Sequence, residues 1–539
     1  MNTKFIATWI FCLGVSAWSS VQAAQNVLLI IADDYGADGS VLYNSTTNGA
    51  SLPPTPNIEA LARSGVVFRN AYANPECSPS RACLITGRYA FRHGIGNLIR
   101  ADPTGGTSDP RLKASEFTLP DAFAANAALG YQLAHFGKWH LTGWSFDQTT
   151  QANADAPNVI GGWPHYAGCL GGALGSMTDR TRFTNWTKTV NGTQTSGYTN
   201  YATTDVVDDA VAWLRARGNQ PWFAWVAFNA SHWPLHKPPN HLHSYDSLPG
   251  TPADISANPR PYFEAMVEAM DTEIGRLLSA VDRTNTHIIF LGDNGTEPNV
   301  IQTPYSSGHA KYTLYEGGIK VPLIIAGPAV VNPGRTNDTL THAVDLYATI
   351  LELAGINVAM TVPASNTVDS HSLLPVLQGA TDSSRYVYSE LFSANAPTAA
   401  DGRTLRNGHF KLMRFTSGRE EFYDLAGDPY ERTNLLTRTL SAVQQANYYA
   451  LTMKLGSYQA ELAPPLISNF TRAANHFSVT VPRGTNLTYR LWKAAILEDL
   501  AWAPTTNALV VTNGTTTVTL TDTNAGDTAQ FYRVESSRR

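Results

Sequence analysis

Short runs of apolar residues alternate with longer amphipathic segments along most of the first 385 residues. Residues 26–32, Asn-Val-Leu-Leu-Ile-Ile-Ala, form a continuous apolar run, which is typical of a strand buried on both faces of a parallel sheet. Residues 287–291 repeat this pattern. Such strands alternating with helices predict an α/β fold in which helices sandwich a mostly parallel central sheet. Further strands are expected at residues 223–228 and 321–326, and helices at residues 55–64, 119–130, 204–217 and 262–281.

The chain changes character after about residue 385. Beyond this point residues 406–415 and 421–425 are expected strands, and residues 439–462 have the apolar spacing of an amphipathic helix. We therefore expect a smaller α+β subdomain over residues 386–463, which follows the main α/β domain over residues 24–385.

The last part of the chain has a different composition. Pro464 and Pro465 mark a linker, and residues 466–539 are rich in Thr and Asn but poor in acidic residues. Short segments in this part alternate apolar and polar side chains, as half-buried strands do. These observations predict an all-β appendage, with strands at residues 477–481, 517–521 and 531–535.

The first residues resemble a secretory signal. Lys4 supplies positive charge, residues 5–17 are mainly apolar, and Val21-Gln22-Ala23 resembles a cleavage site. The apolar run is short for a membrane span, which needs about 20 residues. We therefore expect a signal peptide over residues 1–23, no membrane span after its cleavage, and an exported protein that is periplasmic, attached to the cell surface or secreted.

Composition and charge exclude some classes of partner. The 539 residues are 43% hydrophobic and 15% charged, as in an ordinary globular protein, and the net charge is −5. This charge gives no support for binding to nucleic acid or to an anionic membrane. If Cys12 leaves with the signal peptide, the three remaining cysteines are too few for a disulfide framework. Cys83 and Cys169 either pair or stay free.

Oxygen-bearing side chains follow two of the expected strands. Asp33 and Asp34 come directly after residues 26–32, and Asp293 and Asn294 come soon after residues 287–291. In open α/β sheets, ligands bind at the carboxyl ends of the strands. Three carboxylates and an amide oxygen suit a hard divalent cation, Ca²⁺ first and Mg²⁺ as the alternative, and the lack of a nearby His or Cys cluster disfavours zinc.

Residues 77–87 carry the most specific motif of the chain, Cys-Ser-Pro-Ser-Arg-Ala-Cys-Leu-Ile-Thr-Gly. On physical grounds Cys77, with Arg81 four positions later and a helix N-terminus nearby, suits a thiolate nucleophile as well as a buried structural cysteine. The stretch resembles the C-x-P-S-R-A-x-L-x-T-G signature of the type I sulfatases, which have an alkaline phosphatase-like fold. The resemblance implies that a separate maturation enzyme oxidises Cys77 to formylglycine, whose hydrate is the nucleophile.

Three further segments resemble motifs of the same family. Residues 137–140, Gly-Lys-Trp-His, match its G-K-W-H element, and residues 229–232, Asn-Ala-Ser-His, resemble its N-x-P-H element with Ser231 in place of Pro. Residues 309–322 resemble the G-K-x-x-x-Y-E-G-G-x-R-x-P element, with Ala310 in place of Gly and Lys320 in place of Arg. The resemblance covers residues 25 to 436.

The resemblance also implies a role for each matched residue. Asp33, Asp34, Asp293, Asn294 and residue 77 bind the cation. Asp293 accepts a proton from the attacking hydroxyl group, and His232 protonates the leaving alcohol with the help of Lys311. His140 then accepts the proton of the second hydroxyl group, so that elimination restores the aldehyde and releases sulfate. The implied catalytic residues are Cys77, Arg81, Lys138, His140, His232 and Lys311, and the expected substrate contacts are Lys138, His232, Lys311 and His309.

The substrate class follows less directly. Export and a β-rich appendage suggest a sulfated glycan, so that the chain would act in the degradation of sulfated polysaccharides. Two rival functions remain: a phosphonate or phosphate ester hydrolase on the same fold, and a catalytically silent glycan-binding protein. Aromatic side chains near the motifs either stack on sugars or pack in the core; they are Trp139, Trp144, Trp163, Trp233 and Tyr305.

Overall fold

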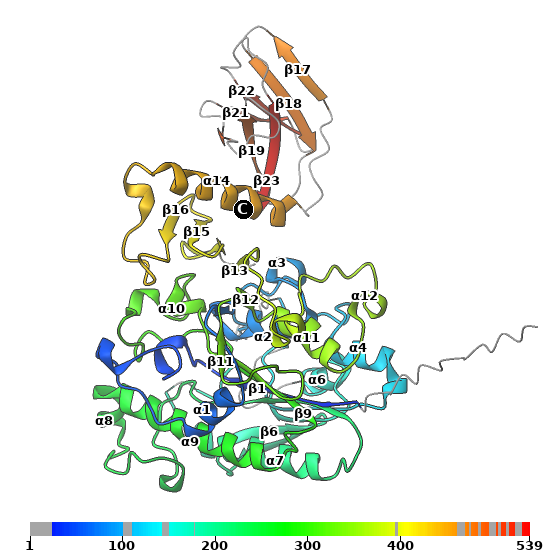
Figure 1. The fold of residues 1–539 in the computed structure, drawn as a ribbon, viewed down its shortest axis with the longest axis vertical. Helices are drawn as coiled ribbons and strands as arrows, with labels where there is room; N and C mark the ends of the chain where they lie inside the picture. The colour runs from blue at the N-terminus through cyan, green and yellow to red at the C-terminus, as the bar shows by residue number, and fades with distance from the viewer. Residues whose placement is uncertain are drawn as a thin grey trace, which may run out of the picture.

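The computed structural model describes residues 24–538 except for several short segments, and Figure 1 shows its three parts: a large α/β body, a smaller sheet beside helix α14 (Ala442–Ala460), and a β-rich C-terminal segment. The predicted signal peptide, residues 1–23, lies outside the described residues, as does Trp144. The segments that are not described are residues 101–109, 143–149, 177, 394–396, 461–468, 474–475, 483–486, 495–502, 505–507, 514–516 and 523–530.

A ten-stranded sheet forms the centre of the α/β body. Its five middle strands run parallel to one another, whereas β10 and the outer strands β6 and β7 pair antiparallel with their neighbours. The predicted α/β class with a mostly parallel sheet is therefore confirmed. In spatial order the strands are β11 (Arg335–Asn337), β2 (Gly65–Phe68), β10 (Leu323–Ala326), β9 (Thr286–Gly292), β1 (Asn26–Ala32), β8 (Trp222–Ala227), β4 (Gln132–Lys138), β5 (Tyr166–Cys169), β6 (Trp186–Val190) and β7 (Thr193–Tyr198).

Helices cover both faces of this sheet because β1 is apolar on both sides. Leu28 and Ile30 belong to one buried cluster, and Val27 and Leu29 belong to another. Successive side chains of a strand point to opposite faces, so each set packs against its own layer of helices. The first layer contains α1 (Pro56–Arg63), α7 (Ala202–Arg215) and α9 (Pro259–Ser279), and the second contains α2 (Cys77–Thr86), α4 (Leu119–Ala125) and α11 (Asp345–Leu353).

The helix expected at residues 119–130 is shorter than predicted. Helix α4 ends at Ala125, where the Asn126 side chain donates a hydrogen bond to the Ala122 carbonyl oxygen at 2.9 Å. A 3-10 turn, Ala127–Leu129, then leads to Gly130, whose φ of 72° ends the helical path. Among the described residues, no helix is both long and apolar enough to cross a membrane.

The smaller sheet has four antiparallel strands and contacts α14. The single strand predicted over residues 406–415 is interrupted, because Arg406 ends one strand and Phe410 begins the next. The Asn407 side chain accepts hydrogen bonds from the backbone N–H groups of His409 and Phe410, so the Asn-Gly sequence forms a tight turn between them. The strands are β13 (Val387–Leu391), β14 (Gly402–Arg406), β15 (Phe410–Phe415) and β16 (Glu420–Asp424).

The C-terminal segment contains two further antiparallel sheets, and α14 also contacts one of their strands, β23. The domain boundaries expected from the sequence stay predictions. One sheet is formed by β17 (Asn469–Ala473), β18 (His476–Pro482), β22 (Thr517–Asp522) and β21 (Ala508–Asn513), and the other by β20 (Ala503–Pro504), β19 (Leu487–Ala494) and β23 (Phe531–Arg538).

Candidate active site

The acidic residues predicted from the strand ends meet at one edge of the central sheet. β1 and β9 pair in parallel up to Ala32 and Gly292, so the residues that follow both strands emerge side by side. The backbone N–H of Asp34 donates a hydrogen bond to the Asp293 carboxylate at 3.2 Å, and the Asn294 amide donates one to the Asp34 carboxylate at 2.8 Å. All four side chains are buried: Asp33, Asp34, Asp293 and Asn294.

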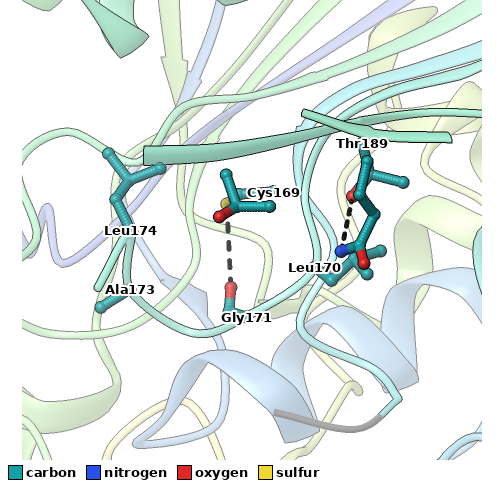
Figure 2. A pocket seen from close by; sticks show the side chains of 8 residues that line it. Cys169, Leu170, Gly171, Ala173, Leu174 and Thr189 are labelled. Atoms are coloured by element: carbon teal, nitrogen blue, oxygen red, sulfur yellow. Dashed lines mark hydrogen bonds between the residues drawn. The ribbon is translucent and has the colours of Figure 1, made fainter. Parts of the chain in front are cut away.

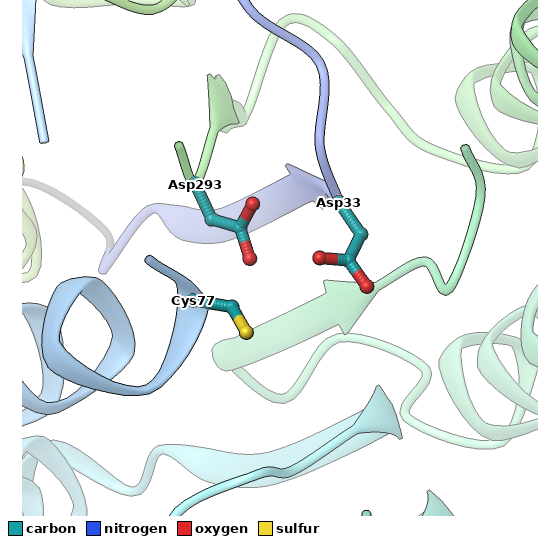
Figure 3. A group of neighbouring side chains, drawn as sticks. All are labelled: Asp33, Cys77 and Asp293. Atoms are coloured by element: carbon teal, nitrogen blue, oxygen red, sulfur yellow. The ribbon is translucent and has the colours of Figure 1, made fainter. Parts of the chain in front are cut away.

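Cys77 begins α2 and points toward the same acidic cluster. Helix α2 starts at Cys77, with Glu76 as its N-cap residue. Figure 3 shows the Cys77 sulfur beside the carboxyl groups of Asp33 and Asp293, and one ligand atom from each of the three lies within 4.8 Å of the others. Burial raises the pKa of the Cys77 thiol to about 12. An unmodified thiol here is therefore protonated at neutral pH and is a poor nucleophile.

Three buried cations surround the carboxylates. The Arg81 guanidinium donates hydrogen bonds to the Asp293 carboxylate, the shorter at 2.7 Å, and a further one to the carbonyl oxygen of Lys138. The Lys138 ammonium group lies 2.5 Å from Asp33. The Lys311 ammonium group lies 2.8 Å from Asp34. Each predicted basic residue thus pairs with one of the predicted cation ligands.

The acidic cluster fits a hard divalent cation. One oxygen of Asp33 and the amide oxygen of Asn294 are buried without a hydrogen-bond partner in the described part of the chain. Burial raises the pKa of Asp33 well above its usual value, and the nearby carboxylates of Asp293 and Asp34 raise it further. Crowded carboxylates and unpartnered oxygens are the environment that an oxygen-binding cation stabilises.

His140 faces Cys77 through one defined ring nitrogen. Its Nδ1 lies 3.1 Å from the Cys77 sulfur, and its Nε2 lies 3.2 Å from the carbonyl oxygen of Ile99. A carbonyl oxygen accepts hydrogen bonds but cannot donate them, so Nε2 carries the proton. Burial, with Lys138 nearby, lowers the pKa of His140 well below its usual value, so the ring is neutral. Nδ1 therefore presents its lone pair to residue 77.

His232 has the opposite tautomer. Its Nδ1 lies 2.7 Å from the carbonyl oxygen of Trp233, so Nδ1 carries the proton, and its Nε2 lies 3.8 Å from the Asp34 carboxylate. Burial lowers the pKa of His232 to about 3, although Asp34 acts in the opposite direction. Burial alone would raise the pKa of Asp34, but Lys311 and His232 lower it to about 2. The Nε2 atom of His232 therefore faces the acidic cluster.

Glu297 and Tyr312 belong to the site, although sequence reasoning did not find them. The Glu297 carboxylate lies 2.9 Å from the Lys311 ammonium group and also accepts a hydrogen bond from the Tyr312 hydroxyl group at 2.5 Å. Glu297 follows Asn294 by three positions in the loop after β9, a spacing that could have singled it out. Tyr312, the neighbour of Lys311 in the chain, has a φ of 72°. This left-handed backbone conformation is rare for residues other than glycine.

The remaining side chains that were considered as substrate contacts have protein partners or lie at the edge of the core. The His309 ring stacks on the Tyr315 ring, with centroids 3.7 Å apart. Trp139 and Trp163 are buried against His135, which makes them core residues, whereas Trp233 is half-buried. The three described cysteines, Cys77, Cys83 and Cys169, are all free, so Cys83 and Cys169 do not pair.

Comparison with known proteins shows the family. The family model described as Sulfatase matches residues 25–356, and the model described as N-sulphoglucosamine sulphohydrolase, C-terminal, matches residues 308–457. The first match alone covers more than half of the chain. The chain therefore belongs to the type I sulfatase family and is a sulfuric ester hydrolase.

Individual relatives agree with this assignment. A sulfatase of Formosa agariphila is 28% identical over 502 residues, which cover 79% of this chain and 87% of that protein. The N-acetylgalactosamine-6-sulfatase of Homo sapiens is 27% identical, over 67% of each chain. A protein solved in complex with its substrate D-glucosamine-2-N,6-O-disulfate has the same fold, with a TM-score of 0.60, 21% identity and coverage of 81% of this chain and 97% of that chain.

Proposed function

We propose that this protein is an exported carbohydrate sulfatase that uses formylglycine, made from Cys77 by a maturation enzyme, as its nucleophile. The observation that carries the proposal is the neutral ring of His140, whose unprotonated Nδ1 lies 3.1 Å from the Cys77 sulfur. Without a bound cation, burial raises the pKa of the Cys77 thiol to about 12 and leaves it protonated at neutral pH. A base aimed at residue 77 is useful if residue 77 carries a hydroxyl group.

A divalent cation would be held by Asp33, Asp34, Asp293 and Asn294 together with residue 77, with Ca²⁺ as the first choice and Mg²⁺ as the alternative. When bound, the cation supplies positive charge that offsets the charge of the sulfate ester and of the nucleophile. Support for this site comes from its oxygen donors and from the unpartnered oxygens of Asp33 and Asn294.

His140 is proposed to act as the base that regenerates residue 77. Formylglycine supplies a hydrated aldehyde. One of its hydroxyl groups would attack sulfur and pass its proton to Asp293, and the second allows sulfate to be expelled. His140 accepts the proton of this second hydroxyl group at Nδ1, and the O–H electron pair becomes part of the aldehyde C=O bond. The C–O bond to sulfate then breaks, and sulfate leaves with the electron pair of that bond.

His232 and Lys311 are proposed to act on the leaving-group side. Both contact the Asp34 carboxylate, so they lie on the same side of the acidic cluster. Nδ1 of His232 donates to a backbone carbonyl, so the neutral ring holds no proton at Nε2. To act as an acid, the ring would first take up a proton at Nε2 and then deliver it to the leaving alcohol. Lys311 would bind the sulfate group, with Arg81 and Lys138 holding charge around residue 77. His309 stays a predicted substrate contact.

A carbohydrate substrate is supported by the names of relatives. The human relative is named for a sulfated amino sugar, and the solved protein was bound to a disulfated glucosamine. The expected signal peptide and β-rich appendage agree with a substrate met outside the cytoplasm, such as a sulfated polysaccharide or its fragments.

The test compares sulfate and phosphate esters directly. Protein co-expressed with a formylglycine-generating enzyme is assayed with para-nitrophenyl sulfate, para-nitrophenyl phosphate and a panel of sulfated sugars, with a Cys77→Ala variant as the control. We expect faster hydrolysis of the aryl sulfate than of the phosphate, and inorganic sulfate released from at least one sugar. Faster phosphate hydrolysis would favour a phosphate or phosphonate ester hydrolase. Glycan binding without turnover by fully converted protein would favour a silent binding protein.

A further inference from the structure

The turn that follows β5 packs against the side chain of His140. The parallel pairing of β4 and β5 continues past the strand ends, because the backbone N–H of Trp139 donates to the Cys169 carbonyl oxygen at 3.0 Å and that of His140 donates to the Leu170 carbonyl oxygen at 3.1 Å. Figure 2 shows that Leu170 and Gly171 of this turn border a small pocket, whose other side is formed by β6 and β7. Gly172, the next residue, lies against the His140 ring.

The contact with His140 leaves no room for a side chain at residue 172. A Cβ atom added to Gly172 would lie 2.4 Å from Cε1 of His140, 2.6 Å from Nε2 and 2.9 Å from Nδ1. Atoms this close overlap, so the imidazole ring would have to move. The ring is held at both nitrogens, by Cys77 and by Ile99. It therefore cannot move without losing its aim at residue 77.

The same turn also contacts the segment that carries His232. The Asn229 amide nitrogen lies 3.2 Å from the Cys169 sulfur, and the sulfur contacts the Gly171 carbonyl oxygen at 3.8 Å. The Cys169 sulfur thus links the turn to residues 229–232. The turn therefore contacts His140 and also the segment that carries His232. This contact holds the turn in place beside His140.

We propose that Gly172 is a positioning residue for the sulfatase reaction: its bare backbone lets the turn pack on His140 and hold Nδ1 against residue 77. This inference rests on the proposed function, in which His140 accepts the proton that regenerates residue 77. A side chain at residue 172 slows that step because it displaces the imidazole ring. Binding of the sulfate ester should change little, because the three atoms nearest to a Cβ at residue 172 all belong to His140.

The kinetic test uses Gly172→Ala, with Gly408→Ala as the matched control. An added Cβ at Gly408 meets nothing within 4 Å, so the control carries the same substitution without a clash. In converted protein we expect Gly172→Ala to lower kcat by about 100-fold with little change in KM, the size expected of a displacement of about 1 Å. Alcohol should appear in a rapid burst, followed by slow turnover, because the second step limits the rate. A kcat within threefold of wild type would overturn the proposal.

A double-mutant cycle tests whether the effect passes through His140. In a His140→Ala background the clash partner is gone, so Gly172→Ala should cause no further loss of kcat. The melting temperature of unconverted protein gives a second readout that does not depend on activity: Gly172→Ala should lower it in the wild-type background and leave it unchanged beside His140→Ala. Equal effects in both backgrounds would show that Gly172 acts independently of His140.

The outcomes separate this inference from the proposed function. If wild-type converted protein releases no sulfate, the proposed function fails, while the melting temperatures still report whether Gly172 packs on His140. If Gly172→Ala alone does not fold, the double variant decides: a folded double variant supports the clash, and an unfolded one contradicts it. Peptide mass spectrometry across residue 77 confirms that variant and wild type are converted to the same extent.

Discussion

The ammonium group of Lys311 lies between two carboxylates of different kinds. Asp34, at 2.8 Å, belongs to the predicted cation ligands, whereas Glu297, at 2.9 Å, does not. A cation bound to Asp34 would weaken the hold of that carboxylate on Lys311. Glu297 would then be the counter-ion that keeps Lys311 in place beside the substrate.

Glu297→Gln should therefore lower kcat/KM for sulfate esters by roughly 10-fold or more, since a hydrogen bond to a charged group contributes about 1.5–3 kcal/mol. The matched control is Tyr312→Phe, which removes the other hydrogen bond to Glu297 and leaves the carboxylate in place. We expect this control to lose less activity than Glu297→Gln, because the Glu297 carboxylate still pairs with Lys311. Steady-state kinetics measure both variants, and equal losses would contradict a role for the carboxylate.

Asp34→Asn should reduce the stabilisation that a divalent cation gives. A ligand at 100 times its Kd stabilises a protein by about 2.7 kcal/mol, so Ca²⁺ or Mg²⁺ added to chelator-treated wild-type protein should raise its melting temperature. Replacing one carboxylate of the crowded cluster weakens that binding, whereas the exposed Asp382→Asn should leave the shift unchanged. An unaltered shift in Asp34→Asn would place the cation elsewhere, and no shift in wild-type protein would argue against the site.

The sequence predicted the parts of this site that depend on strand ends and on contiguous motifs. Continuous apolar runs marked β1 and β9 as buried parallel strands, and parallel strands end at the same edge of a sheet, so Asp33 and Asp293 could be brought together without coordinates. Cys77 and His140 were found because their neighbours in the chain carry specific motifs.

Contacts between separate loops could not be predicted in the same way. The closeness of Gly172 to His140 depends on how far β4 and β5 continue to pair beyond their last residues. The pattern of apolar and polar residues along the chain does not indicate where this pairing stops. The pairing of Glu297 with Lys311 joins two loops whose approach is set by the packing around them. The turn at Asn407 was missed because apolar residues on both sides gave residues 406–415 the pattern of one long strand.

Lys411→Met should destabilise the junction between the α/β body and the smaller sheet. Lys411 is fully buried, and its ammonium group lies 3.1 Å from Glu316 and 2.7 Å from Glu431. Removing one partner from a buried ion pair costs about 3–5 kcal/mol, because it leaves charge without compensation. Denaturant unfolding should show a loss of this size, and the exposed Lys113→Met should show none. A loss below about 1 kcal/mol would mean that the two carboxylates are readily neutralised.

Glu390→Gln should remove part of the pH dependence of stability. Burial raises the pKa of Glu390 from 4.5 to about 7. Its contribution to stability is thus fully present below pH 4.5 and is lost as the pH rises through 7, by at most about 3 kcal/mol. The neutral amide of Gln keeps an acceptor for the backbone N–H of Phe91, so the variant should lose less stability than wild type between pH 5 and pH 8. Thermal unfolding at both pH values measures this, and the exposed Glu352→Gln is the control. Identical pH profiles for Glu390→Gln and wild type would contradict the prediction.

The most direct test of the account relates activity to the chemical state of residue 77. Preparations expressed with and without a formylglycine-generating enzyme are mixed in known ratios, the converted fraction is measured by peptide mass spectrometry across residue 77, and sulfate release is measured on the same samples. The account predicts that activity rises in proportion to the formylglycine fraction and falls to zero with it. Full activity from protein that retains the Cys77 thiol would contradict it.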